Sequence, residues 1–344
     1  MVISQSHEKK VVRQTRLNGL FPNTQNPVVF SAPMLGTANG TLAAEVTKAG
    51  GFGFIPAGYN FSSDSDGPDH LAQLSQELAI ARKLLDLEEA MLTALPVGVG
   101  FILCHESTAT HFISNAIPVL QEHSPQAVWL FAPRVEDVEK GVIKEIVERL
   151  HDNGFVVFYQ VGTVKAVKEA VRDGADVVVA QGTDAGGHQE VLVVAAGGIV
   201  DGRGVVAALA LGADAVVMGT RFLLAQEATT PQFKQELIAK TTDGASSTFK
   251  HSVMDDIQGT TIWPKVYDGR AIVGDSVEDH LNGVPTEENV RLFKEAAEKG
   301  ETNRMITWAG SAVGLVNKIQ PAGEIVKEVR EEALQRIKEL QNLF

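Results

Sequence analysis

A single histidine stands among small residues where a strongly apolar run of this chain ends. The run Val177–Ala180 leads into the octapeptide Gln181-Gly182-Thr183-Asp184-Ala185-Gly186-Gly187-His188. A buried strand that opens into glycines and then a histidine is typical of the ligand-facing end of an α/β barrel. Histidine accepts or donates a proton near neutral pH, so we take His188 as a candidate general base.

Three other strand ends carry residues that suit a flat, phosphate-bearing ligand. Ala195-Ala196-Gly197-Gly198-Ile199 and Met218-Gly219-Thr220-Arg221-Phe222 end the seventh and eighth apolar runs. Backbone N–H groups of the loops in these two positions commonly bind phosphate in barrels. The first run ends in Ser31-Ala32-Pro33-Met34, where Met34 is either a core residue or a polarizable contact for a flat ring.

Eight valine-rich runs without polar alternation must position these residues. Continuous apolar runs predict strands that are buried on both faces, hence a parallel sheet. Helical patterns lie between most of the runs, which favours a (β/α)₈ barrel of the TIM type. The runs are Val28–Met34, Gly53–Ala57, Val97–Ile102, Ala127–Pro133, Val156–Val161, Val177–Gly182, Leu192–Ile199 and Ala215–Thr220; the helical patterns are Gly40–Ala49, Asp69–Leu85, Val135–His151, Val164–Arg172 and Gly204–Leu211.

The periodicity changes after Phe222, which predicts an appendage to the barrel. Amphipathic helices are expected over Gln226–Lys240 and Glu287–Lys299, with a last helix from Ala322 to Leu340. We therefore expect a barrel over residues 1–223, a mostly helical substrate-side domain over 224–320, and a C-terminal helix over 321–344 that returns to the barrel.

Bulk properties exclude several classes of function. The net charge of −13 argues against nucleic acid and anionic membranes as partners. One cysteine, Cys104, excludes an internal disulfide framework and is expected to be a buried small hydrophobe. No long apolar run and no secretory signal are present, so we expect no membrane span and a cytoplasmic protein.

The remaining polar residues are interpreted as structural. His105, His111, His123 and His151 lack metal-ligand spacing, so no metal site is expected. Asp176 and Asp214 follow matching Gly-Ala pairs and are read as turn residues, and Glu77 as part of a solvated helix face. Arg221 is left open between a phosphate or substrate contact and a salt-bridged scaffold arginine.

The chain resembles the flavin-dependent nitronate monooxygenases, formerly called 2-nitropropane dioxygenases. The motifs named above carry the resemblance, together with Tyr159-Gln160-Val161-Gly162-Thr163. It continues through Trp263-Pro264, Asp268-Gly269-Arg270 and Trp308-Ala309-Gly310, which resemble the fungal branch. It thus covers nearly the whole chain from about Val28.

The resemblance implies an FMN enzyme that oxidises alkyl nitronates or nitroalkanes with O₂ to a carbonyl compound and nitrite. The resemblance implies that His188 is the catalytic base. The flavin-binding positions it implies are Ala32, Pro33, Met34, Gln181, Gly186, Gly198, Gly219 and Thr220. Neither the motifs nor the composition decides whether the chain forms a homodimer.

One connection departs from the family pattern. Only the eight residues Thr183 to Glu190 separate Gly182 from Val191, whereas a parallel crossover normally needs a dozen or more. The helix between strands six and seven is therefore expected to be missing. The alternatives are a strained but complete barrel, a seventh strand that pairs out of place, and a nonfunctional product; we favour a barrel of reduced stability.

Two other functions stay open at this stage. A related flavoprotein group, the NAD(P)H-dependent enoyl-thioester reductases, shares the glycine-histidine loop and the barrel. A catalytically silent or unstable flavin-binding protein is the second alternative, because of the missing crossover.

Overall fold

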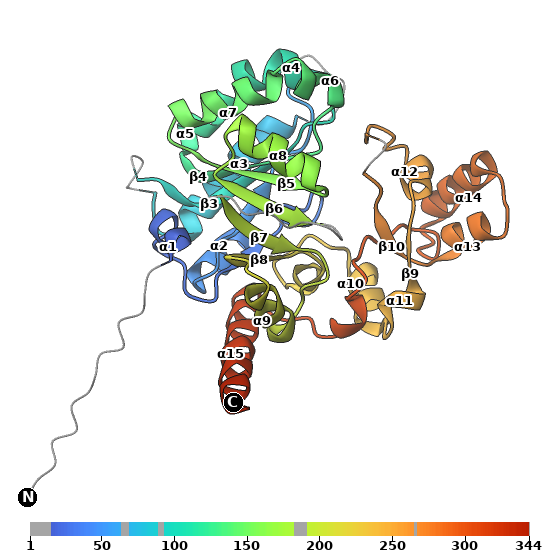
Figure 1. The fold of residues 1–344 in the computed structure, drawn as a ribbon. Coiled ribbons are helices and arrows are strands. Elements are labelled where there is room, and N and C mark those ends of the chain that lie inside the picture. Colours follow the sequence, from blue (N-terminus) through green and yellow to red (C-terminus); the bar gives the residue numbers. More distant parts are fainter. Residues whose placement is uncertain (1–14, 63–68, 89–92, 182–190, 265–266, 344) are drawn as a thin grey trace, which may run out of the picture.

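The computed structural model describes residues 15–62, 69–88, 93–181, 191–264 and 267–343. Eight parallel strands form one sheet in the order β1-β8-β7-β6-β5-β4-β3-β2. A parallel bridge between Phe30 and Phe52 joins its two ends, so the sheet closes into the predicted barrel (Figure 1). The strands are β1 (Val29–Ser31), β2 (Phe54–Pro56), β3 (Leu95–Ile102), β4 (Pro125–Phe131), β5 (Val156–Val161), β6 (Val177–Gln181), β7 (Leu192–Ala196) and β8 (Ala215–Met218).

Aromatic side chains fill the barrel interior. Phe30, Phe54 and Phe158 are fully buried, with ring centroids 5.2–6.1 Å apart. Helix α1 (Arg16–Leu20) closes the amino-terminal end of the barrel, because Phe21 at its carboxyl end packs 4.6 Å from Phe52. The interior is therefore a packed core, and the opposite end of the barrel is left for ligands.

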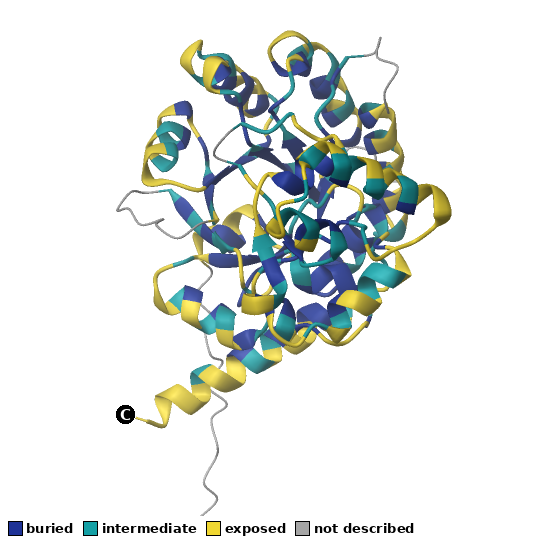
Figure 2. Ribbon diagram, turned by 90° about the vertical axis from the view of Figure 1, so that its right-hand side faces the viewer, coloured by how far each residue is buried: buried dark blue, intermediate teal, exposed yellow. Residues whose placement is uncertain are grey.

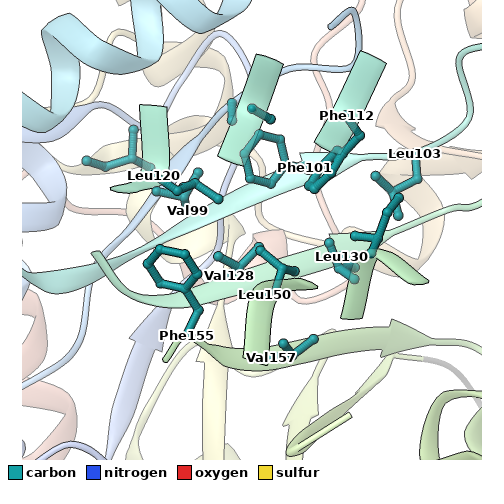
Figure 3. Packing of buried hydrophobic residues seen from close by; sticks show 14 of the residues in the cluster. Val99, Phe101, Leu103, Phe112, Leu120, Val128, Leu130, Leu150, Phe155 and Val157 are labelled. Atoms are coloured by element: carbon teal, nitrogen blue, oxygen red, sulfur yellow. The ribbon is translucent and has the colours of Figure 1, made fainter. Parts of the chain in front are cut away.

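Helices cover the outside of the barrel. They are α2 (Gly40–Lys48), α3 (His70–Leu84), α4 (Ser107–His111), the π-helix η1 (Phe112–Ala116), α5 (Ile117–His123), α6 (Val135–Glu139), α7 (Val142–Asp152), α8 (Val164–Asp173) and α9 (Gly202–Ala210). On the β3–β5 side, Val99, Phe101, Leu130 and their neighbours pack between the strands and these helices (Figure 3).

Two details of this helical layer differ from the sequence expectations. The helix expected over Val135–His151 is two helices, since α6 ends at Glu139 and α7 begins at Val142. Glu77 is not part of a solvated face: its carboxylate accepts a hydrogen bond of 2.6 Å from the Gly40 N–H. It thereby satisfies a free backbone donor at the start of α2, which the sequence pattern could not reveal because the two residues lie on different helices.

Strand β7 occupies its proper place despite the short connection. It pairs in parallel with β6 over five residue pairs, from Val177–Leu192 to Gln181–Ala196, and with β8 over three. The barrel is thus complete, and the alternative in which the seventh strand pairs out of place is wrong. The prediction that no helix connects β6 to β7 falls on residues 182–190, which lie outside the described residues.

The carboxyl-terminal part contains a helical appendage and one long helix. The appendage comprises the 3₁₀-helix η2 (Thr220–Leu224), α10 (Gln232–Lys240), α11 (Gly244–Ser247), α12 (Val253–Gln258), α13 (Asp275–Leu281), α14 (Thr286–Lys299) and the 3₁₀-helix η3 (Val313–Leu315). An unexpected antiparallel pair, β9 (Thr248–Lys250) and β10 (Arg270–Ile272), lies among them. The helix expected from Gln226 begins only at Gln232.

Helix α15 (Ala322–Gln341) packs back on the barrel. Its residues Ile325, Val326 and Val329 are buried in one cluster with Val29 of β1 and Val216 of β8. Its last turns extend beyond the barrel and are exposed (Figure 2). Among the described residues, no helix is long and apolar enough to cross a membrane.

Candidate active site

Residues predicted from four separate strand ends meet at one edge of the barrel. Parallel strands place their carboxyl ends together, and the register of β6, β7, β8 and β1 shows which residues are paired there. Gln181 of β6 pairs with Ala196 of β7, Ala196 with Val217 of β8, and Met218 with Ser31 of β1. The segments that follow these residues therefore surround one end of the barrel interior.

The segment after β1 lies against the end of β8. The Ala32 N–H donates to the Met218 carbonyl at 3.0 Å. A Cβ placed on Gly219 would lie 3.6 Å from Met34 Sδ and 3.8 Å from Ala32 Cβ. Ala32, Met34 and Gly219 are each partly exposed, so all three border the barrel mouth together.

Pro33 reaches across to the next side of the mouth. A Cβ on Gly100 of β3 would come within 2.4 Å of the Pro33 ring. Such a contact leaves no room for any residue but glycine at position 100. The proline is thereby held against β3, which fixes the direction of the segment that carries Met34.

Gly197 and Gly198 form an open backbone surface beside Gln181. Both are exposed, with φ of +92° and +71°. Nothing lies within 4 Å of a Cβ placed on Gly198, and one on Gly197 would meet Gln181 Cγ at 3.6 Å. Successive left-handed residues expose backbone groups that suit an anion, and helix α9 begins four residues later, at Gly202.

A hydrogen-bonded relay orients the Gln181 side chain. The Trp129 indole N–H donates to Gln160 Oε1 at 3.0 Å, and Gln160 Nε2 donates to Gln181 Oε1 at 2.7 Å. Because its oxygen is occupied, Gln181 presents its NH₂ group as a donor toward the mouth. Gln160 belongs to the Tyr159–Thr163 motif but is not among the site residues predicted from the sequence; its place two residues after Phe158, on the inward face of β5, was the available signal.

The Thr220 and Arg221 side chains connect the barrel to the carboxyl-terminal part. Thr220 Oγ1 accepts a hydrogen bond of 2.9 Å from Gly310 N–H, within the Trp308-Ala309-Gly310 motif. Arg221 is buried, donates to the Lys318 carbonyl at 3.2 Å and pairs with Glu328 at 3.4 Å. Arg221 is therefore a scaffold residue, which decides between the two readings left open by the sequence.

His188 and Gly186, the proposed base and one proposed flavin contact, lie outside the described residues. Of the strands on either side of them, β6 ends with Gln181 at the mouth, and β7 begins with Leu192 at the opposite end of the same pair.

Other polar groups have structural roles. Burial raises the pKa of Cys104 to about 11, so its thiol is protonated and inert at neutral pH. Asp176 and Asp214 each accept a 2.8 Å hydrogen bond from a strand N–H, of Val157 and Val193 respectively, as turn residues. Within the described ranges, no group of three or more possible metal ligands gathers.

The comparison with known families is consistent with this arrangement. A family model described as nitronate monooxygenase matches residues 16–192 and 189–332. A nitronate monooxygenase of Neurospora crassa is 50% identical over 370 residues, covering 98% of this chain and 97% of that protein. The nitronate monooxygenase npaC of Metarhizium robertsii is 33% identical, covering 91% of this chain and 92% of that protein.

The solved structure of FabK from Thermotoga maritima has the same fold. It is 24% identical, with a TM-score of 0.72, and the match covers 96% of this chain and 99% of FabK. Identity at this level supports the barrel and its appendage alone, whereas the full-length match at 50% identity establishes the family. The chain belongs to the nitronate monooxygenase family, a family of oxidoreductase enzymes.

Proposed function

We propose that this enzyme oxidises alkyl nitronates with O₂ and releases a carbonyl compound and nitrite. The observation that carries the proposal is the meeting of Ala32, Met34, Gln181, Gly198 and Gly219 around one barrel mouth. These are the positions that the family motifs assign to the flavin. They follow four different strands, so the motifs supply these residues and the barrel fold brings them together.

Membership in the family implies a flavin cofactor, and we propose that the flavin is FMN. The described residues fit such a group. Gly197 and Gly198 offer an open, left-handed backbone for a terminal phosphate, Gln181 offers an oriented NH₂ donor, and Met34 offers a polarizable side chain beside them. Pro33 and Thr220 complete the proposed set, and Gly186 remains a proposal outside the described residues.

The protein residues would supply position and a proton acceptor. When bound, the flavin takes electrons from the nitronate and passes them to O₂, so the redox chemistry belongs to the cofactor. His188 would accept the α-proton of a neutral nitroalkane at an imidazole nitrogen, or orient a nitronate that is already formed. Gln181, held by Gln160, would keep its donor in one direction throughout turnover.

The comparisons support the expectation of a shortened crossover. The two segments of the family match meet at residues 189–192, where β7 begins. The alignment with the Neurospora protein spans 370 positions, and 98% of this 344-residue chain supplies about 337 of them. About 33 positions therefore have no counterpart here. The complete register of β7 supports a barrel that tolerates this loss.

The visible absorption spectrum of the purified protein is the direct test. A bound flavin whose absorbance bleaches on anaerobic addition of a nitronate supports the proposal. A colourless protein that takes up neither FMN nor riboflavin would contradict it and favour the silent relative. Bleaching by NADH but not by a nitronate would instead favour the enoyl-thioester reductase, which needs a nicotinamide donor.

A further inference from the structure

Phe131 closes one side of the barrel mouth, opposite the proposed flavin positions. It is the last residue of β4 and packs on the interior cluster of the barrel, as Ala32 and Ala196 do. In the closed order of eight strands, β4 lies across the barrel from β8. A molecule bound between Phe131 and the Ala32–Gly219 side would therefore lie over the barrel axis.

Two aromatic side chains of the appendage lie on Phe131. The Tyr267 ring stands edge-on to it, with centroids 5.2 Å apart and an interplanar angle of 84°. The Trp263 ring lies 6.0 Å away at 51°. These are the separations of attractive aromatic pairs. Phe131, Trp263 and Tyr267 are hereafter called the aromatic wall.

The wall is held in place by buried polar contacts. Asp255 of α12 is 8% exposed, and its carboxylate accepts a hydrogen bond of 2.9 Å from Thr260 Oγ1. Burial raises the pKa of Asp255, and the Trp263 side chain lies close enough to lower it in part. The Tyr267 N–H donates to the Pro264 carbonyl at 2.8 Å. A ring that is fixed before a ligand arrives loses little conformational entropy on binding.

Charge near the wall is largely neutralised. Arg134, which follows β4, pairs with both Asp137 and Glu136, at 2.7 and 3.1 Å. Lys250 pairs with Asp268, the neighbour of Tyr267. Burial, and after it the nearby Glu169 carboxylate, which pairs with Lys165 at 3.7 Å, raise the pKa of Tyr267, so its phenol is neutral at pH 7. Within the described part of the chain, the wall thus offers apolar surface and a neutral hydroxyl; Lys265 lies outside that part.

We propose that the aromatic wall is the substrate-specificity surface, and that it packs on the uncharged alkyl chain of the nitronate. This inference rests on the proposed function, because it assumes that the substrate enters between the wall and the flavin positions. It predicts that longer unbranched nitronates are preferred. Each methylene that the wall covers should raise kcat/KM about fourfold.

The test compares nitronates of two to five carbons and one of matched length that ends in a carboxylate. Phe131→Leu and Trp263→Leu should reduce the gain per methylene to less than about twofold, since each removes aromatic contact area. Phe249→Leu is the matched control: Phe249 lies in β9 and packs on His251, so the wild-type gain should persist. Thermal midpoints of all variants are measured alongside.

Calorimetric titration of the same nitronates into the flavin-loaded protein separates this inference from the proposed function. If the protein binds longer nitronates more tightly but does not oxidise them, the result would contradict the proposed function and support the proposal that the aromatic wall binds the alkyl chain. If kcat/KM depends on alkyl length in Phe131→Leu and Trp263→Leu as it does in wild type, whatever their thermal midpoints, the proposal for the aromatic wall would be overturned. Preference for the carboxylate-ended nitronate would overturn it too.

Discussion

At the residue scale, the direction in which the Gln181 NH₂ group points depends on Gln160, a buried residue below the barrel mouth. Gln160 is 9% exposed and joins Trp129 to Gln181. Replacing it by leucine would leave the Trp129 N–H without its acceptor and free Gln181 to rotate. We expect Gln160→Leu to lower the free energy of unfolding by about 1–3 kcal/mol and to weaken FMN binding.

Fluorescence titration with FMN and urea unfolding would measure both effects. Gln126→Leu is the control, because Gln126 is only partly buried and lies near the start of β4, at the other end of the barrel. Equal FMN affinity in Gln160→Leu and wild type would show that the relay does not orient a flavin contact.

His188 carries a separate prediction at this scale. His188→Asn removes a proton acceptor but keeps a polar side chain of similar size. We expect it to abolish oxidation of neutral nitroalkanes and to spare turnover of preformed nitronates, because only the former requires deprotonation. Oxygen consumption with both forms of one substrate measures this. Equal losses on both would mean that His188 does not act simply as a base.

At the element scale, the loop after β7 must hold a conformation that other residues resist. Gly198 has φ +71°, and alanine there would cost about 1–2 kcal/mol. Gly154 has φ +79° with equally open surroundings, but it precedes β5 at the opposite end of the barrel. Both Gly→Ala variants should lose similar stability, and only Gly198→Ala should bind FMN more weakly. Similar FMN affinity in the two variants would argue against a phosphate at Gly198.

The short connection predicts an uncovered flank on β7. Val178 of β6 and Val193 of β7 are direct parallel neighbours on one face, yet Val178 is 1% exposed and Val193 is only partly buried. Val178→Thr should therefore cost about 1–3 kcal/mol, and Val193→Thr less than about 0.5 kcal/mol. Urea unfolding of both variants measures the contrast. A comparable cost at Val193 would mean that this flank is covered in solution.

At the scale of the whole molecule, two buried histidines make stability depend on pH. Burial lowers the pKa of His70 and of His123 below the ordinary 6.5. Each is therefore neutral in the folded chain, while the unfolded chain binds the proton more readily. Their contribution is present above about pH 6.5 and is lost as the pH falls through the lowered values.

Unfolding by urea at pH 7.5 and 5.5 would detect this loss. His70 Nδ1 accepts from the Tyr59 and Asn60 N–H groups at 3.3 and 3.2 Å, and asparagine offers a similar acceptor without titrating. His70→Asn should thus lose less stability between the two pH values than wild type does. An unchanged difference would place the pH dependence elsewhere.

The sequence by itself determined the kind of fold and the family. Continuous apolar runs and the glycines after them are local signals, and they placed all eight strands near their observed positions because buried parallel strands tolerate few other residues. The strand-end motifs were equally local, which is why Ala32, Met34, Gln181, Gly198 and Gly219 could be named in advance. The division at residues 223 and 320, the flavin contacts and a homodimer stay predictions.

Tertiary structure alone decided which distant groups meet. Gln160 orients Gln181, Glu77 caps α2, Arg221 binds the C-terminal segment, and Trp263 and Tyr267 pack on Phe131. Each contact joins residues on different elements, and no periodicity along the chain encodes such a pair. The place of β7 was likewise decided by packing: its register with β6 and β8, and the burial of Leu192 and Val194 inside the barrel, hold it where a short connection alone would not.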